Sequence, residues 1–297
     1  MIKVTKIAHL SGHKDSIYAL TYALHEKSMY SGSADGMVVR WNPFKEADGH
    51  LVMKCPTPVY SLCVNTLNII IAGTREGNLH IGDLNLIKEI KWIQAHEGGI
   101  FDILPYKNGI LTLSEDGSIA HWDEQFQLQF RIKVATKSLR IGRFKNEHTL
   151  IVGSSDHSIY QVNLQTQHIE QEYHAHTNSV FALAYQPHSA NFYSGGRDAQ
   201  LIKWEMESGK HEKIPAHLYH INALDIHPTA PLMISGSMDK TIKLWDLTNF
   251  KLIKVIDYER HQSHLNCVNK VLWIDTNHFI SCSDDRTIMV FELSNHI

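Results

Sequence analysis

The sequence lacks long hydrophobic runs and concentrated basic stretches. No segment approaches the roughly 20 apolar residues of a membrane span, and residues 1–10 have no apolar core for a secretion signal. With 28 Lys and Arg against 31 Asp and Glu, the formal net charge is −3. Sequence-independent nucleic-acid binding needs a concentrated basic surface. We therefore expect a soluble, cytoplasmic chain with neither a membrane nor a nucleic-acid partner.

Cysteine is also scarce, and the signature motifs of common enzymes are missing. The four cysteines show no paired metal-ligand spacing and favour a reducing compartment: Cys55, Cys63, Cys267 and Cys282. There is no phosphate-binding glycine loop, zinc-protease helix motif or nucleophile elbow. Histidine pairs such as His217 with His220, or His261 with His264, suggest a metal site, but such a pair rarely converges on one ion without carboxylate or cysteine help. We predict no metal and no cofactor.

What the sequence does contain is a pattern that recurs seven times. Each copy has an acidic residue and, six positions later, an apolar or aromatic residue followed by a polar acceptor, as in Asp239 with Trp245-Asp246. The acidic positions are Asp35, Glu76, Asp116, Asp156, Asp198, Asp239 and Asp285. They lie 40 to 42 residues apart, except for a last interval of 46. A period of this length is typical of repeat architectures.

The residues between these landmarks indicate short paired strands. Five copies have a histidine 20 to 22 residues before the acidic residue: His13, His96, His176, His217 and His264. Segments such as 241–245 are β-branched and aromatic, and Asp-Gly or Asp-Lys turns bound them. Pairs such as Asp35-Gly36, Glu76-Gly77 and Asp116-Gly117 tolerate the positive φ of tight hairpins. We expect about four strands per copy and almost no helix.

Together these residues resemble the WD-repeat (WD40) family of β-propellers, and the resemblance covers essentially the whole chain. It implies an all-β fold in which residues 1–297 form one seven-bladed β-propeller of four-stranded antiparallel blades. A single four-stranded sheet cannot bury both of its faces, so the copies must stack, and a closed ring leaves no unburied end. Residues Ile2–His9 precede the first copy, and the last, about 263–293, lacks an outermost strand. We predict that the N-terminal strand completes this last blade.

In the family, a histidine, a serine or threonine, an acidic residue and a tryptophan of one repeat form a buried hydrogen-bond network. The resemblance implies four complete structural sets: His13, Ser31, Asp35, Trp41; His96, Thr112, Asp116, Trp122; His176, Ser194, Asp198, Trp204; and His217, Ser235, Asp239, Trp245. The seventh copy keeps His264, Ser281 and Asp285, but Phe291 replaces the tryptophan. Serine, histidine and aspartate also form catalytic triads. Because the set recurs at one phase of the repeat, we predict a scaffold role and no catalytic residues.

The resemblance further implies a central funnel, with two positions per repeat at its mouth. The first follows the first apolar residue of the innermost strand: Tyr18, Tyr60, Phe101, Arg140, Phe181, Asn222 and Asn269. The second precedes the acidic turn residue: Ala34, Arg75, Glu115, Ser155, Arg197, Met238 and Asp284. From these we select as partner-binding residues Tyr18, Tyr60, Phe101, Phe181, Arg75, Glu115, Arg197, Met238 and Asp284.

Aromatic rings beside arginines are enriched at binding hot spots. The Tyr and Phe faces are suited to an arginine or lysine of a partner, through cation–π contacts of about 0.5 to 2 kcal/mol, with Glu115 or Asp284 balancing its charge. The same rings would also simply fill the funnel, and the sequence leaves both interpretations open. A second candidate surface is the long connection over residues 257–263, which accounts for the last interval.

We therefore expect a non-enzymatic protein-protein interaction scaffold that docks peptide or protein partners on the funnel mouth or the rim. It would be monomeric alone or a subunit of a complex. The alternative is a propeller enzyme, or a metal- or small-molecule-binding protein, that uses the funnel as its site. That alternative needs a polar cluster that breaks the repeat, and only Arg75, Glu115, Arg197 and Asp284 approach one.

Overall fold

The computed structural model describes residues 2–45, 48–186 and 189–295. Within these ranges the chain forms seven four-stranded antiparallel sheets and a single short helix. It divides into two compact units. The first unit comprises residues up to 72, residues 81–91 and those from 222 onward, and the second comprises residues 73–80 and 92–221.

The first unit contains almost all of three sheets. One has β2 (Ile17–Ala23), β3 (Ser28–Ser33), β4 (Met37–Trp41) and β5 (His50–Lys54) in sequence order. The next has β22 (Ile221–Ile226), β23 (Leu232–Ser237), β24 (Ile242–Asp246) and β25 (Lys251–Ile256). Helix α1 (Tyr258–His261) follows β25. The last sheet contains β26 (Val268–Trp273), β27 (His278–Ser283) and β28 (Thr287–Asn295), with β1 (Ile2–Ser11) as its fourth strand.

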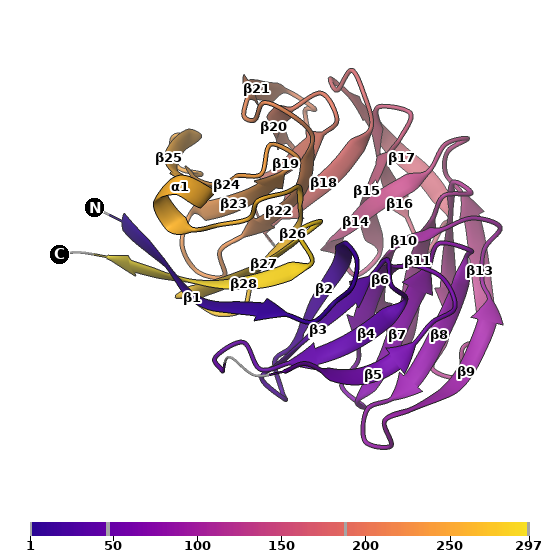
Figure 1. Cartoon of the computed structure of the whole chain (residues 1–297). Helices are drawn as coiled ribbons and strands as arrows, with labels where there is room; N and C mark the ends of the chain where they lie inside the picture. Colours follow the sequence, from indigo (N-terminus) through magenta and orange to yellow (C-terminus); the bar gives the residue numbers. More distant parts are fainter. Residues whose placement is uncertain (1, 46–47, 187–188, 296–297) are drawn as a thin grey trace. The chain divides into compact units, whose positions relative to one another are not determined.

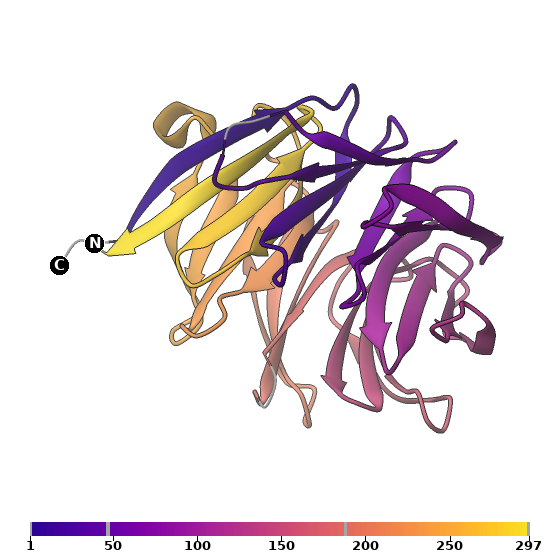
Figure 2. The same cartoon turned by 90° about the horizontal axis from the view of Figure 1, so that it is seen from below.

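The pairing of β1 with β28 joins the two ends of the sequence. The two strands are antiparallel, with Ile2 opposite Asn295 and Ser11 opposite Thr287. Both views show the indigo β1 running alongside the yellow β28 (Figure 1, Figure 2). The N-terminal strand therefore completes the last sheet, as predicted, and covers the edge that β28 would otherwise present to solvent.

The second unit contains three further sheets in sequence order. They consist of β10 (Ile100–Tyr106), β11 (Gly109–Ser114), β12 (Ser118–Trp122) and β13 (Leu128–Lys133); β14 (Leu139–Asn146), β15 (Thr149–Ser154), β16 (Ser158–Asn163) and β17 (His168–His174); and β18 (Val180–Tyr185), β19 (Asn191–Gly196), β20 (Gln200–Glu205) and β21 (His211–Pro215). The remaining sheet has residues of both units: β6 (Val59–Val64), β7 (Ile69–Thr74), β8 (Asn78–Asp83) and β9 (Lys88–Gln94).

The second strand of each sheet is covered on both faces, so its burial does not alternate. Every residue of β15, for example, is buried. Close packing at such a strand requires glycine in places, since a Cβ at Gly32 of β3 would lie 2.5 Å from Val59 Cγ1 of β6. The outermost strands differ, because β9 alternates exposed and half-buried residues along its length. The core therefore lies between sheets and toward their inner strands.

The acidic turns have the positive φ that the sequence predicts. Gly36, Gly77 and Gly117 have φ values of 78° to 80°. The same position in the last four copies holds residues with side chains, and their φ values range from 60° to 79°: His157, Ala199, Lys240 and Arg286. The tight hairpin thus requires left-handed backbone whether or not glycine is present to lower its cost.

Candidate functional site

The repeated histidine and aspartate lie within hydrogen-bonding distance of each other. His13 Nδ1 is 3.0 Å from Asp35 Oδ2, and His13 Nε2 is 2.7 Å from Ser31 Oγ. The indole N–H of Trp41 donates to the same Ser31 oxygen at 2.7 Å. Corresponding histidine–aspartate distances of 2.8 to 2.9 Å join His96 to Asp116, His176 to Asp198, and His264 to Asp285. In the β22–β25 sheet, Trp245 donates to Ser235 Oγ at 2.8 Å.

The direction of these hydrogen bonds follows from the chemistry of each group, as the set around His176 illustrates. An ionised carboxylate only accepts, so Nδ1 of His176 donates to Asp198, and its unprotonated Nε2 accepts from the Ser194 hydroxyl. The Ser194 oxygen in turn accepts from the Trp204 indole. Every donor meets an acceptor, and both ring nitrogens of the histidine are engaged. The arrangement stabilises a turn and leaves no accessible nitrogen for acid-base catalysis.

Burial and hydrogen bonding act in opposite directions on the acidic members. Burial by itself would raise the pKa of Asp285, but hydrogen bonds from His264, Thr287 and Leu265 outweigh it and hold the pKa at about 2. The same balance lowers the pKa of Asp116 well below its usual range, with His96 and Ser118 as the main donors. These carboxylates are therefore ionised at neutral pH, as acceptors of a structural network should be.

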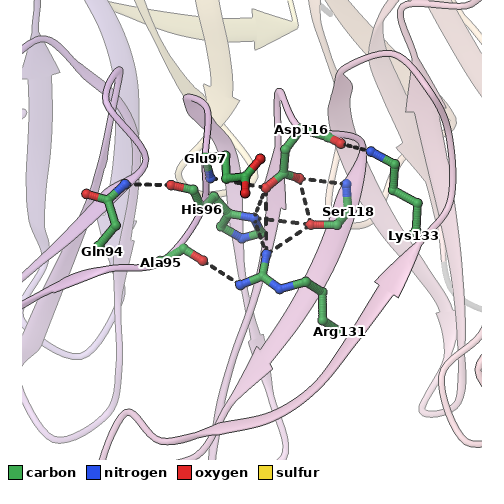
Figure 3. A pocket seen from close by; sticks show the side chains of 8 residues that line it. All are labelled: Gln94, Ala95, His96, Glu97, Asp116, Ser118, Arg131 and Lys133. Atoms are coloured by element: carbon green, nitrogen blue, oxygen red, sulfur yellow. Dashed lines mark hydrogen bonds and ion pairs between the residues drawn. The ribbon is translucent and has the colours of Figure 1, made fainter.

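The set around His96 has additional polar neighbours (Figure 3). Arg131 Nη1 lies 2.7 Å from His96 Nδ1, the nitrogen that also faces Asp116, and Arg131 Nη2 donates to the Ala95 carbonyl. Because Arg131 only donates and Asp116 only accepts, Nδ1 can serve just one of them. A cavity of about 480 Å³ lies beside this set, lined by Gln94, Ala95, His96, Glu97, Asp116, Ser118, Arg131 and Lys133. The side chain of His96 is nevertheless fully buried.

Five of the predicted funnel residues lie at irregularities in their strands. In the pairing of β2 with β3, Ile17 is opposite Ser33 and Ala19 is opposite Gly32, so Tyr18 has no partner in the ladder. The same shift skips one residue in four other innermost strands: Phe101, Arg140, Phe181 and Asn269. A bulge of this kind redirects a side chain out of the regular alternation. Sequence reasoning selected these positions without detecting the bulges.

In the first unit, two bulge residues, Tyr18 and Asn269, and two of their neighbours form what we call the tyrosine cluster: Tyr18, Tyr60, Asn269 and Asp284. The rings of Tyr18 and Tyr60 meet edge to face, with centroids 5.5 Å apart. Asn269 Nδ2 donates to Asp284 Oδ1 at 2.8 Å and to the Ile17 carbonyl at 2.9 Å. Burial raises the pKa of Tyr18, and the Asp284 carboxylate is among the further causes of that rise. All four residues are partly exposed.

In the second unit, three bulge residues and two of their neighbours form what we call the arginine cluster. The bulge residues are Phe101, Arg140 and Phe181, and the neighbours are His220 and Ser155. The guanidinium carbon of Arg140 lies 4.1 Å from the Phe101 centroid and 5.5 Å from the Phe181 centroid. Arg140 Nε–H donates to Ser155 Oγ at 2.8 Å. The position that we expected a partner's cation to take against these two rings is therefore held by the chain's own Arg140.

Two further features extend the arginine cluster. The ring of His220 packs against Phe181 at 5.8 Å. Burial lowers the pKa of His220, and the positive charge of Arg197 lowers it further. Four residues predicted to bind a partner lie outside the two clusters and are exposed: Arg75, Glu115, Arg197 and Met238. The Glu115 carboxylate accepts from the Gly99 amide at 3.2 Å.

The long connection before the last sheet forms α1 and one wall of a second cavity, of about 720 Å³. Asp257 caps the helix by accepting from the Arg260 amide, and Lys6 Nζ of β1 donates to the Gln262 carbonyl at 2.8 Å. The lining includes Lys6 and His9 of β1 and Tyr258, Glu259 and Leu265. This second candidate surface is thus joined to the strand that completes the last sheet.

In the described ranges 2–45, 48–186 and 189–295, no three His, Cys, Asp or Glu side chains are grouped so as to hold a metal ion. Helices long and apolar enough to cross a bilayer are not found there either. The four cysteines are free thiols.

Comparison with known proteins identifies the family. The family model described as "WD domain, G-beta repeat" matches residues 4–42, 167–205, 210–246 and 251–292, which together exceed half of the sequence. The chain therefore belongs to the WD40 family. The crystal structure of the WD40 β-propeller domain of Doa1 superimposes with a TM-score of 0.87 at 18% identity, over 97% of each chain. With the seven four-stranded sheets, this likeness shows the fold to be an all-β, seven-bladed propeller.

Three curated relatives have sequence identities of 21% to 23%, similar to that of the Doa1 domain. The 66 kDa stress protein of Physarum polycephalum is 21% identical over 302 residues, which is 96% of this chain but 48% of that protein. The WD repeat domain-containing protein 83 homolog of Dictyostelium discoideum is 23% identical over 80% of this chain and 70% of its own length. A striatin homolog from the same organism is 22% identical over 90% of this chain and 39% of its own length. The chain thus spans about half the length of the first of these relatives.

Proposed function

We propose that this chain is a non-enzymatic scaffold that docks a peptide or protein partner through its bulge residues. The observation that supports this most strongly is the repeated bulge, which redirects Tyr18, Phe101, Arg140 and Phe181 away from the strand ladders. Aromatic and arginine side chains dominate binding hot spots because they offer large contact areas with polar edges. The exposed side chains of Arg75, Glu115, Arg197 and Met238 are further candidate contacts for the partner.

A propeller enzyme is the weaker proposal for this chain. The polar cavity beside His96 contains the residue types of a catalytic site, but His96 is buried with Asp116 and Thr112 on its two ring nitrogens. A general base must reach the substrate proton directly or through one water. We further propose that the protein acts in the cytoplasm, where free thiols persist, as a monomer or as a subunit of a complex.

The test is purification of the tagged protein from its own cells, followed by mass spectrometry, with three chains in parallel. These are the wild type, the Tyr60→Ala/Phe101→Ala variant and a Phe44→Ala control, whose ring is 49% exposed in the turn after β4. We expect a stoichiometric partner with the wild type and the control, and its loss with the double variant. Thermal unfolding checks that the double variant stays folded, because both rings are only half-buried.

Two outcomes would contradict the proposal. A double variant that has lost several kcal/mol of stability would show that the two rings are core residues, since that cost is typical of buried aromatic truncation. Recovery of a bound metal ion or small molecule, without any protein partner, would instead favour the alternative of a ligand-binding or enzymatic propeller.

A further inference from the structure

We propose that the arginine cluster is a binding site for an acidic side chain, so that the partner segment contains Asp or Glu where it meets Arg140. This inference rests on the proposed scaffold function and specifies the chemistry of the partner. It reverses the polarity expected from the sequence, in which aromatic rings receive a partner's cation.

The aromatic faces of the cluster already hold a cation. Arg140 lies against Phe101 at 4.1 Å and against Phe181 at 5.5 Å, both within the roughly 6 Å range of cation–π attraction. A second cation placed on these rings would displace Arg140 or be repelled by it. An anion would instead be attracted to the same place.

Arg140 is also held in a defined orientation. Two rings restrict its plane, and Ser155 Oγ accepts from its Nε–H at 2.8 Å. A planar, restrained fork loses less rotational freedom on binding than a mobile lysine does, and it matches the two oxygens of a carboxylate.

The charge beside the cluster is also positive. His220 contacts Phe181, and the positive charge of Arg197 lowers the pKa of His220, so Arg197 adds positive charge on the His220 side of the cluster. Positive charge at this aromatic surface complements an acidic segment better than a basic or neutral one.

The experiment uses the full chain and a random-peptide phage library. Peptides selected on the wild type are synthesised with a fluorescent label, together with versions in which Asp and Glu become Asn and Gln. Binding is measured by fluorescence anisotropy to the wild type, Arg140→Gln, Arg140→Lys and the control Lys145→Gln. Lys145 lies on the same strand, and its ammonium group donates to Gln161.

We expect the selected peptides to be acidic. Amide replacement in the peptide and Arg140→Gln in the protein should each weaken binding at least about tenfold, which is about 1.4 kcal/mol. The two changes together should weaken binding by less than the product of their separate effects, as expected for groups in contact. Lys145→Gln should bind as the wild type, and Arg140→Lys should fall between the wild type and Arg140→Gln.

Three results would overturn the inference. The first is the selection of basic or neutral peptides. The second is the selection of acidic peptides whose affinity is unchanged when Asp and Glu are replaced by Asn and Gln. This second measurement uses only the wild-type protein, so it does not depend on the folding of any variant. Peptides that lose affinity with Tyr60→Ala and Phe101→Ala but not with Arg140→Gln would also overturn it, while leaving the scaffold function intact. Failure of the wild type to select any peptide would count against both proposals.

Discussion

Trp204→Phe tests whether the repeated hydrogen-bond sets are structural. The Trp204 indole is 1% exposed and donates to Ser194 Oγ at 2.7 Å, and Ser194 also contacts His176. Phenylalanine keeps the aromatic ring but removes the N–H donor. The last sheet already has this arrangement, because Phe291 stands at the equivalent position while His264 and Ser281 remain 2.8 Å apart.

The expected cost follows from two losses. Removing a typical hydrogen bond costs about 1 kcal/mol net. The smaller ring lacks roughly three buried atoms, which adds about 2 kcal/mol at about 0.8 kcal/mol per buried methylene-sized group. The free energy of unfolding should therefore fall by about 3 kcal/mol, and the melting temperature by about 6 °C for a chain of this size.

The assay is urea unfolding monitored by circular dichroism, with Trp92→Phe as the matched control. Trp92 lies on the outermost strand β9 with 62% of its surface exposed, so its replacement should change stability by less than about 0.5 kcal/mol. Equal stability of the Trp204 and Trp92 variants would refute the structural interpretation of the sets. Retained peptide binding by the Trp204 variant is also expected, because Trp204 is buried in another sheet than Arg140, where it donates to Ser194, and is not part of the arginine cluster.

Two further predictions concern pH and the hairpin turns. Burial lowers the pKa of His96, so below about pH 6.5 the unfolded chain binds more protons than the folded chain. The free energy of unfolding should therefore fall as the pH drops from 7 to 5. It should fall again below about pH 4, because the pKa of Asp285 is lower in the folded chain than in the unfolded chain. A urea midpoint that stays constant or rises over that range would contradict this. Gly36→Ala should cost about 1 to 3 kcal/mol, since φ is 78° and the new Cβ would meet the Cys55 carbonyl oxygen at 2.4 Å. The free energy of unfolding of Ala199→Gly, at φ 60°, should stay within about 0.5 kcal/mol of the wild type, because relief of left-handed strain offsets the added freedom of the unfolded chain. Similar losses of stability by calorimetry in Gly36→Ala and Ala199→Gly would contradict the left-handed backbone at these turns.

The sequence by itself determined the repeat, and through it the number and kind of sheets. Positions such as Asp239 and Trp245 recur at a constant phase, and their hydrogen-bond chemistry depends on spacing within one copy. The pairing of β1 with β28 was also predictable from the repeat. The last copy lacks an outermost strand, and the N-terminal strand precedes the first copy and belongs to no other. Local turn chemistry likewise predicted the positive φ of Gly36 and Gly117.

Tertiary structure alone decided what the bulge residues contact. Sequence periodicity does not reveal that Phe101 and Arg140 are skipped in their ladders, because register depends on how each strand meets its neighbour. Nor does it show that Arg140 of β14 reaches both Phe101 of β10 and Phe181 of β18. These residues are about 40 positions apart, and only the packing of successive sheets places the guanidinium against the two rings. The ring faces that the sequence suggested for a partner's cation are therefore occupied by Arg140 of the chain itself.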